Sequence, residues 1–215
     1  MKNGTWISVA ALIVAIVAAI IAFTQRNPQT PATTPQEEVA APAAINMDDL
    51  VGMEDQEKAN LLFSFASTKA YQFTWHYETE PPAGFYEGNP PHGGILRTYM
   101  NNIAYDAVER QLGTFPPGSI IVKENHMPGD FQIDKSDDSR VVEGFSGNLA
   151  AITIMAKISG YNPEAGDWFW TKLQPDGTID AAGKPETCIG CHGTVSKNDF
   201  VYDANVSGTL SRAGN

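Results

Sequence analysis

Two cysteines and a histidine near the C-terminal end, Cys188, Cys191 and His192, form the strongest chemical motif of this sequence. Their order, Cys-x-x-Cys-His, is the attachment pattern of c-type haem. Both thiols must reach the two vinyl groups of one porphyrin, while the histidine comes up beneath the ring to bind iron. One turn of helix meets both demands. The motif therefore predicts one covalently attached haem c, with His192 as the proximal iron ligand.

Other uses of paired cysteines fit the sequence less well. A disulfide or a Cys-x-x-Cys redox pair needs only the cysteines, and the redox pair is expected beside a strand–helix junction. Here residues 180–187 have the composition of a loop, and a histidine follows the second cysteine at once. Both cysteines of the chain lie in the motif, so no second pair exists to complete a zinc site.

The second axial ligand must come from upstream of the motif, or be water, or be absent. Residues 193–215 contain neither methionine nor histidine. His126 and Met127 are candidates, and His76 is a weaker one. Met100 and Met155 lie in predicted strands, where core packing is the better explanation for methionine.

The elements before the motif predict an α+β fold, an antiparallel β-sheet haem domain with flanking helices. A late haem motif also suits four-helix cytochromes, but the β-branched runs argue against a bundle. We expect helices over 57–63, with Asp48 or Asp49 as the cap, and over 102–112; strands over 95–100, 119–124, 149–159 and 167–173; a turn at 175–177; and loops over 77–91 and 125–143.

The N-terminal part predicts a membrane anchor and a tether. Residues 6–23 are almost wholly apolar and are just long enough to cross a bilayer core as a helix. A cleaved signal peptide is the alternative, but no clear small-x-small cleavage site follows. The predicted parts are an anchor over 1–26, a Pro/Ala/Thr-rich linker over 27–45 and a haem domain over 46–215. Because haem c is attached outside the cytoplasm, we expect a cytoplasmic (inner) membrane protein whose haem domain is periplasmic or otherwise extracytoplasmic.

The charge balance excludes one class of partner. The chain has 14 Lys and Arg against 25 Asp and Glu, a net charge of -11. Such a surface repels phosphate backbones, so nucleic acid is not an expected partner. It would instead steer a redox partner protein with a basic face towards the haem domain.

Several short motifs follow one another along the chain: Pro91–Gly93, Arg97–Tyr99, Gly118–Glu124, Gly160–Trp170, Pro175–Gly177 and Cys188–His192. In this order they resemble the motifs of the cytochrome P-460 family, which includes the cytochromes c′-beta. The resemblance covers roughly residues 50–205. It implies a β-sheet core with flanking helices, one haem c and commonly a homodimer; some members oxidise hydroxylamine and others bind nitric oxide.

The resemblance also assigns expected roles to residues outside the haem motif. Lys123 matches the lysine that hydroxylamine-oxidising members link to the porphyrin; alternatively, it is an ordinary lysine facing solvent. His92 stands where members with an open distal site tend to carry an aromatic residue, so it is a candidate distal ligand or a hydrogen-bond donor to a small ligand. Arg97 is expected to pair with a haem propionate or polarise a distal ligand, and Glu124 to manage protons.

Three functions follow as hypotheses. The first is a membrane-tethered monohaem cytochrome that transfers single electrons between larger redox proteins. The second is an enzyme, with Lys123 cross-linked and an open iron site, that oxidises hydroxylamine or processes nitric oxide. The third is a haem-based gas sensor or scavenger without turnover.

Overall fold

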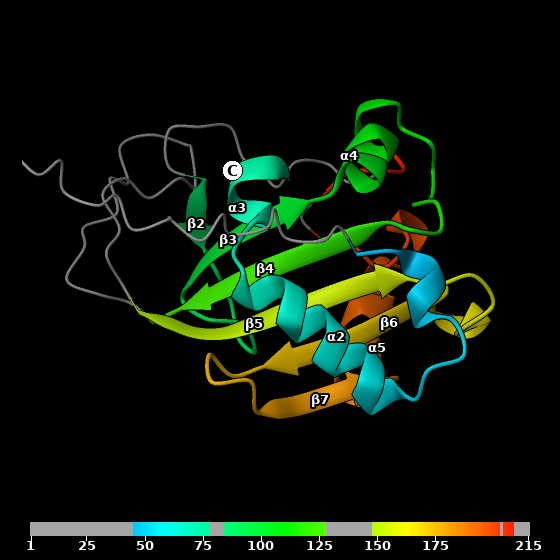
Figure 1. The fold of residues 1–215 in the computed structure, drawn as a ribbon. Coiled ribbons are helices and arrows are strands. Elements are labelled where there is room, and N and C mark those ends of the chain that lie inside the picture. Colours follow the sequence, from blue (N-terminus) through cyan, green and yellow to red (C-terminus); the bar gives the residue numbers. More distant parts are fainter. Residues whose placement is uncertain (1–44, 78–83, 128–147, 203, 209–215) are drawn as a thin grey trace, which may run out of the picture. The chain divides into compact units, whose positions relative to one another are not determined.

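The fold is built on a seven-stranded antiparallel sheet (Figure 1). The computed structural model describes residues 45–77, 84–127, 148–202 and 204–208. Strands pair in the order β1-β3-β4-β5-β6-β7, and β2 also pairs with β3. The strands are β1 (His76–Tyr77), β2 (Phe85–Glu87), β3 (Ile95–Met100), β4 (Ile120–His126), β5 (Leu149–Lys157), β6 (Trp168–Leu173) and β7 (Ile179–Gly183).

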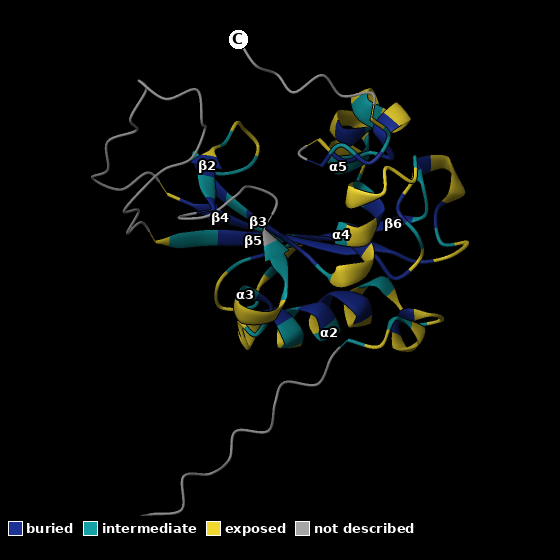
Figure 2. Cartoon of the chain, turned by 90° about the horizontal axis from the view of Figure 1, so that it is seen from above, coloured by how far each residue is buried: buried dark blue, intermediate teal, exposed yellow. Residues whose placement is uncertain are grey.

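Helices lie against both faces of this sheet. Figure 2 shows the sheet edge-on, with α2 and α3 on one side and α5 on the other. The helical elements are η1 (Met47–Leu50), α2 (Asp55–Ser67), α3 (Tyr71–Thr74), α4 (Asn102–Glu109), η2 (Pro163–Ala165), α5 (Glu186–His192) and η3 (Gly193–Asn198).

The sheet separates two hydrophobic clusters because successive side chains of a strand point to opposite faces. On the side of α2, Val122 and Ile154 join Leu62 of the helix. On the side of α5, Ile121 and Met155 join Trp170, and Cys188 packs against them. The central strands are therefore apolar on both faces, as expected of strands buried between two layers.

The predicted fold class is confirmed, and most of its elements are present. The strands expected over 95–100, 119–124, 149–159 and 167–173 correspond to β3, β4, β5 and β6, and all their pairings are antiparallel. The helix that carries Leu62 begins at Asp55 after a capping box between Glu54 and Glu57. The helix predicted over 102–112 ends earlier, at Glu109.

Two loop predictions are wrong in part. The stretch 77–91 contains β2, and the stretch 180–187 contains most of β7, which adds an edge strand beside β6. Both strands are short and contain or adjoin glycine, which lowers their strand propensity. Tertiary pairing with β3 and β6 overrides that weak local signal.

The predicted anchor over 6–23 and most of the tether lie outside the described residues, so both remain predictions. Within the ranges that the structure describes, none of the helices has the length and apolar character needed to cross a membrane. Most of the loop predicted over 125–143 also lies outside these ranges, but Asn125 and His126 belong to β4.

Candidate functional site

A cavity lies on the face of the sheet that carries α5. Its floor is formed by two neighbouring rows of side chains that run across β3, β4 and β5. One row is apolar and consists of Met100, Ile121 and Met155. The other is polar and consists of Thr98, Lys123 and Thr153.

This two-row floor suits a haem, which has an apolar ring and anionic propionates at one edge. Among the described residues that line the cavity, Lys123 carries the positive charge that could meet the propionates. Nearby, Trp170 buries its indole Nε1 without a hydrogen-bond acceptor in the described part of the chain. Its ring centre lies 6.5 Å from that of His192. The floor therefore offers apolar contact area and a cation, and a buried donor lies on the neighbouring strand β6, where Trp170 pairs with Met155.

The haem-attachment motif forms the single turn of helix that it predicts. Cys188, Cys191 and His192 all lie in α5. The two thiols form no disulfide. Burial raises the pKa of the Cys188 thiol, whereas a redox-active pair needs a lowered one. The geometry therefore fits haem attachment and opposes the redox-pair alternative.

His192 closes the cavity from α5 with its imidazole held by the backbone. Nδ1 of His192 lies 2.6 Å from the carbonyl oxygen of Phe200, so Nδ1 carries the proton and donates it. Nε2 is then the ring nitrogen that would bind iron. A hydrogen bond of this kind fixes the tautomer and the orientation of a metal-binding histidine.

His92 closes the cavity from the loop 88–94, between β2 and β3. Its ring centre lies 6.2 Å from that of His192, with an interplanar angle of 79°. Two imidazoles on opposite sides of one metal, each bound at about 2 Å, have ring centres roughly 6 Å apart. The two histidines are thus spaced for one iron between them, and the residues present fit a haem.

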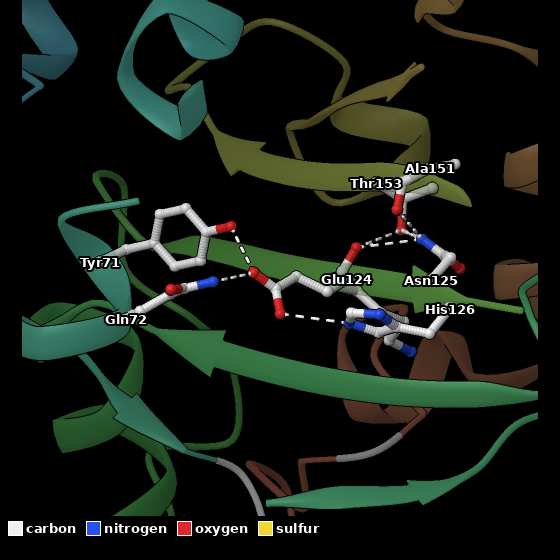
Figure 3. Close-up of polar contacts among 8 residues, drawn as sticks. Tyr71, Gln72, Glu124, Asn125, His126, Ala151 and Thr153 are labelled. Atoms are coloured by element: carbon white, nitrogen blue, oxygen red, sulfur yellow. Dashed lines mark hydrogen bonds and ion pairs between the residues drawn. The ribbon is translucent and has the colours of Figure 1, made fainter. Parts of the chain in front are cut away.

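Asn125, one strand period beyond Lys123 on β4, sets the orientation of His92. Oδ1 of Asn125 lies 3.0 Å from Nδ1 of His92. The amide nitrogen of Asn125 donates to the carbonyls of Lys123 and Ala151 and contacts Thr153 (Figure 3). Because the amide nitrogen is directed at these acceptors, Oδ1 must accept from His92. His92 therefore also carries its proton on Nδ1, so Nε2 is the nitrogen that would bind a metal.

A family model described as Cytochrome P460 matches residues 65–203. The chain belongs to the cytochrome P460 family. The match runs from α2 past the motif in α5, so it contains His92, Lys123 and His192. The family resemblance expected from the motifs is confirmed, and this cytochrome P460 family member is a c-type haem protein. No curated protein matches the chain.

The structure does not bring Arg97 and Glu124 to the cavity. Both lie on the opposite face of the sheet, because they alternate along their strands with Thr98 and Lys123, which line the cavity. The Arg97 guanidinium stacks on Phe85, 4.8 Å from its ring centre. The roles expected of Arg97 and Glu124 at a haem find no support in this placement.

Glu124 is instead the centre of a buried polar cluster beneath α3 (Figure 3). Its carboxylate accepts hydrogen bonds from the Tyr71 hydroxyl at 2.7 Å and the Gln72 amide at 2.5 Å. Nε2 of His126 lies 3.4 Å from the other oxygen. Burial by itself would raise the pKa of Glu124, but the hydrogen bonds from His126, Tyr71 and Gln72 outweigh it and hold the pKa below its usual value.

The other predicted ligands fall into two groups. His126 faces Glu124, His76 contacts Asn102 and stacks on Tyr105, and Met127 is exposed, so none of the three lines the cavity. Met100 and Met155 are core residues, as expected, but their side chains also line the cavity. They are the second group of possible iron ligands after His92.

Gly93 allows the His92 loop to lie directly against β4. A Cβ atom at this position would stand 2.7 Å from the carbonyl oxygen of His126 and 3.0 Å from its amide nitrogen. Backbone atoms cannot move aside cheaply. We expect Gly93→Ala to lower the free energy of unfolding by about 1–3 kcal/mol and to add a high-spin component to the visible spectrum by displacing His92.

Gly190→Ala is the matched control for this substitution. A Cβ at Gly190 meets no atom within 4 Å, and the glycine lies in α5, where alanine is favourable. Its spectrum should match that of the wild-type protein, and its denaturant midpoint should be equal to the wild-type value or slightly higher. A Gly93→Ala spectrum identical to wild type would contradict the close packing of the loop on β4.

Proposed function

We propose that this protein is an electron-transfer cytochrome in which His192 and His92 are the two axial ligands of one haem c. The observation that carries the proposal is the paired histidine geometry. The rings are 6.2 Å apart, and the Nδ1 of each has a hydrogen-bond partner that directs Nε2 inward. Two strong ligands occupy both axial positions of the iron. This arrangement suits electron transfer better than substrate binding.

When bound, haem c supplies a one-electron iron couple, and the protein's own residues hold and shield it. Cys188 and Cys191 would carry the thioether links, and Lys123 with its threonine neighbours would lie near the propionate edge. Met100, Ile121 and Met155 would exclude water from the ring. A dry shell of this kind disfavours the charged ferric form and raises the haem potential.

We further propose that the haem domain works outside the cytoplasm, tethered to the cytoplasmic membrane. The proposal rests on the apolar residues 6–23, the proline-rich stretch 27–45 and the haem-attachment motif. The net charge of -11 supports a redox partner with a basic face. A homodimer is the arrangement that the family resemblance suggests.

An enzyme that oxidises hydroxylamine or processes nitric oxide is the second candidate. The observation in its favour is Lys123, whose side chain lines the same cavity as His92 and His192. An amine held there would lie beside a porphyrin bound in this cavity. In this case His92 would stand back from the iron and serve as the proton donor or acceptor, since Glu124 faces away. A gas sensor would share this open site without turnover.

One preparation of the full chain with its haem separates these proposals. For an electron carrier we expect a low-spin ferrous spectrum that carbon monoxide changes only at concentrations far above those that saturate an open haem, and haem peptides that contain Cys188 and Cys191 only. A red-shifted Soret band, together with a peptide that carries Lys123 on the porphyrin, would overturn the carrier and establish the enzyme. A carbon monoxide shift without the Lys123 link would favour the sensor.

A further inference from the structure

The chain makes an unusual corner at the end of η3, the short helix that follows α5. Asp199 and Phe200 are consecutive non-glycine residues with φ of 53° and 64°. Left-handed backbone is unfavourable for residues with a Cβ atom, and it persists only where the surroundings hold it in place. Two such residues in a row therefore indicate a corner that other parts of the fold maintain.

Three buried hydrogen bonds hold this corner against the sheet. The Asp199 carboxylate accepts from Nζ of Lys157, at the end of β5, and from the amide of Phe115 at 2.7 Å. The Asp199 carbonyl accepts from the indole nitrogen of Trp168, at the start of β6, at 2.8 Å. Asp199 is 5% exposed and Lys157 7% exposed. The ion pair is thus shielded from water. A shielded, charge-assisted hydrogen bond of this kind strongly fixes the positions of the groups that it joins.

The stretch Gly160–Trp170, one of the motifs that resemble the cytochrome P-460 family, packs against the corner. A Cβ atom on Gly166 would stand 2.7 Å from Oδ1 of Asp199 and 3.1 Å from the Phe200 ring. The turn that carries Gly166 therefore packs directly against the corner, and Trp168 follows two residues later. This motif has no residue in the cavity, so its part in the site is indirect.

The corner places one backbone group, the Phe200 carbonyl, beside His192. The Phe200 carbonyl oxygen lies 2.6 Å from Nδ1 of His192 and accepts a hydrogen bond from it. We propose that Asp199, held by Lys157 and Trp168, is a positioning residue that sets the strength of this hydrogen bond. A strong bond from Nδ1 makes the imidazole a better electron donor to iron, which favours the ferric state and lowers the midpoint potential.

This role holds whether the sixth position is filled or open, so its failure would leave the proposed function standing. Variants that loosen the corner should raise the midpoint potential. Two of them keep the net charge: Trp168→Phe, and the double variant Lys157→Met with Asp199→Asn. With charge unchanged, a shift in potential reports the His192 hydrogen bond rather than a lost or added charge.

The control is a second lysine–aspartate pair, on the other face of the sheet, in which the lysine is buried and the aspartate is partly exposed. Lys58 is 4% exposed and lies 3.4 Å from Asp55. The double variant Lys58→Met with Asp55→Asn should lower stability without moving the potential. The measurement is a spectroelectrochemical titration of the full chain with its haem, alongside denaturant unfolding of each variant.

We expect positive shifts for Lys157→Met/Asp199→Asn and smaller positive shifts for Trp168→Phe, with the control at the wild-type value. Equal potentials in all variants would overturn the proposal and leave the corner a purely structural feature. If the Lys157/Asp199 variant fails to take up haem, Trp168→Phe decides the question by itself. Trp168→Phe removes only the indole N–H donor and keeps the acceptor, the Asp199 carbonyl.

Discussion

Replacing His92 with alanine is expected to turn a six-coordinate, low-spin haem protein into a high-spin one that binds carbon monoxide readily. A ligand for iron must wait for His92 to leave, so its apparent affinity is reduced by the fraction of molecules that are open. If about 1% of wild-type molecules are open, His92→Ala raises the apparent carbon monoxide affinity about 100-fold. Absorbance titration of the ferrous protein measures both the spin state and the affinity.

His76→Ala is the matched control, because His76 is a histidine outside the cavity that stacks on Tyr105. Its spectrum should equal that of the wild type. Asn125→Leu should give an intermediate result, since it keeps the His92 imidazole but removes its hydrogen-bond acceptor. A low-spin spectrum that survives His92→Ala would transfer the ligand role to Met100 or Met155, which also line the cavity.

The sheet was predictable where hydrophobic runs are long. Residues 149–157 form a β-branched run that leaves little choice but a central strand. The strand Ile179–Gly183 is not predictable in this way, because its alanine and glycine residues carry little strand preference and its pairing with β6 is a tertiary contact. Local composition indicates central strands well and edge strands poorly.

The haem-attachment helix was predictable from its motif. The rest of the site was not, because it depends on which side chains of each strand point to the cavity. Lys123 and Glu124 are neighbours, and only the alternation within β4 sends Lys123 to the cavity and Glu124 to the α3 side. The same alternation adds Asn125, two residues from Lys123, which spacing could have found. Asp199 and Phe200 gave no such signal, because their contribution comes from backbone conformation.

The buried Glu124 carboxylate is expected to dominate the acid sensitivity of the fold. Its pKa lies below the ordinary value of 4.5 in the folded protein. The unfolded chain therefore binds more protons in this range, and stability falls as the pH drops through the folded pKa. The free energy of unfolding, measured with denaturant at several pH values from about 7 to 3, should fall at the acid end. Glu124→Gln should flatten this part of the curve.

The cost of losing Glu124 altogether follows from its partners. Tyr71 has a raised pKa, because it is buried and lies beside the Glu124 charge, so its hydroxyl stays protonated and needs an acceptor. Glu124→Leu leaves that hydroxyl, the Gln72 amide and His126 without their shared carboxylate, at a cost of about 3–5 kcal/mol. Glu124→Gln keeps one acceptor oxygen and should cost about 1–3 kcal/mol. Since the cluster faces away from the cavity, both variants should keep the wild-type haem spectrum at neutral pH; a changed spectrum would connect the cluster to the haem after all.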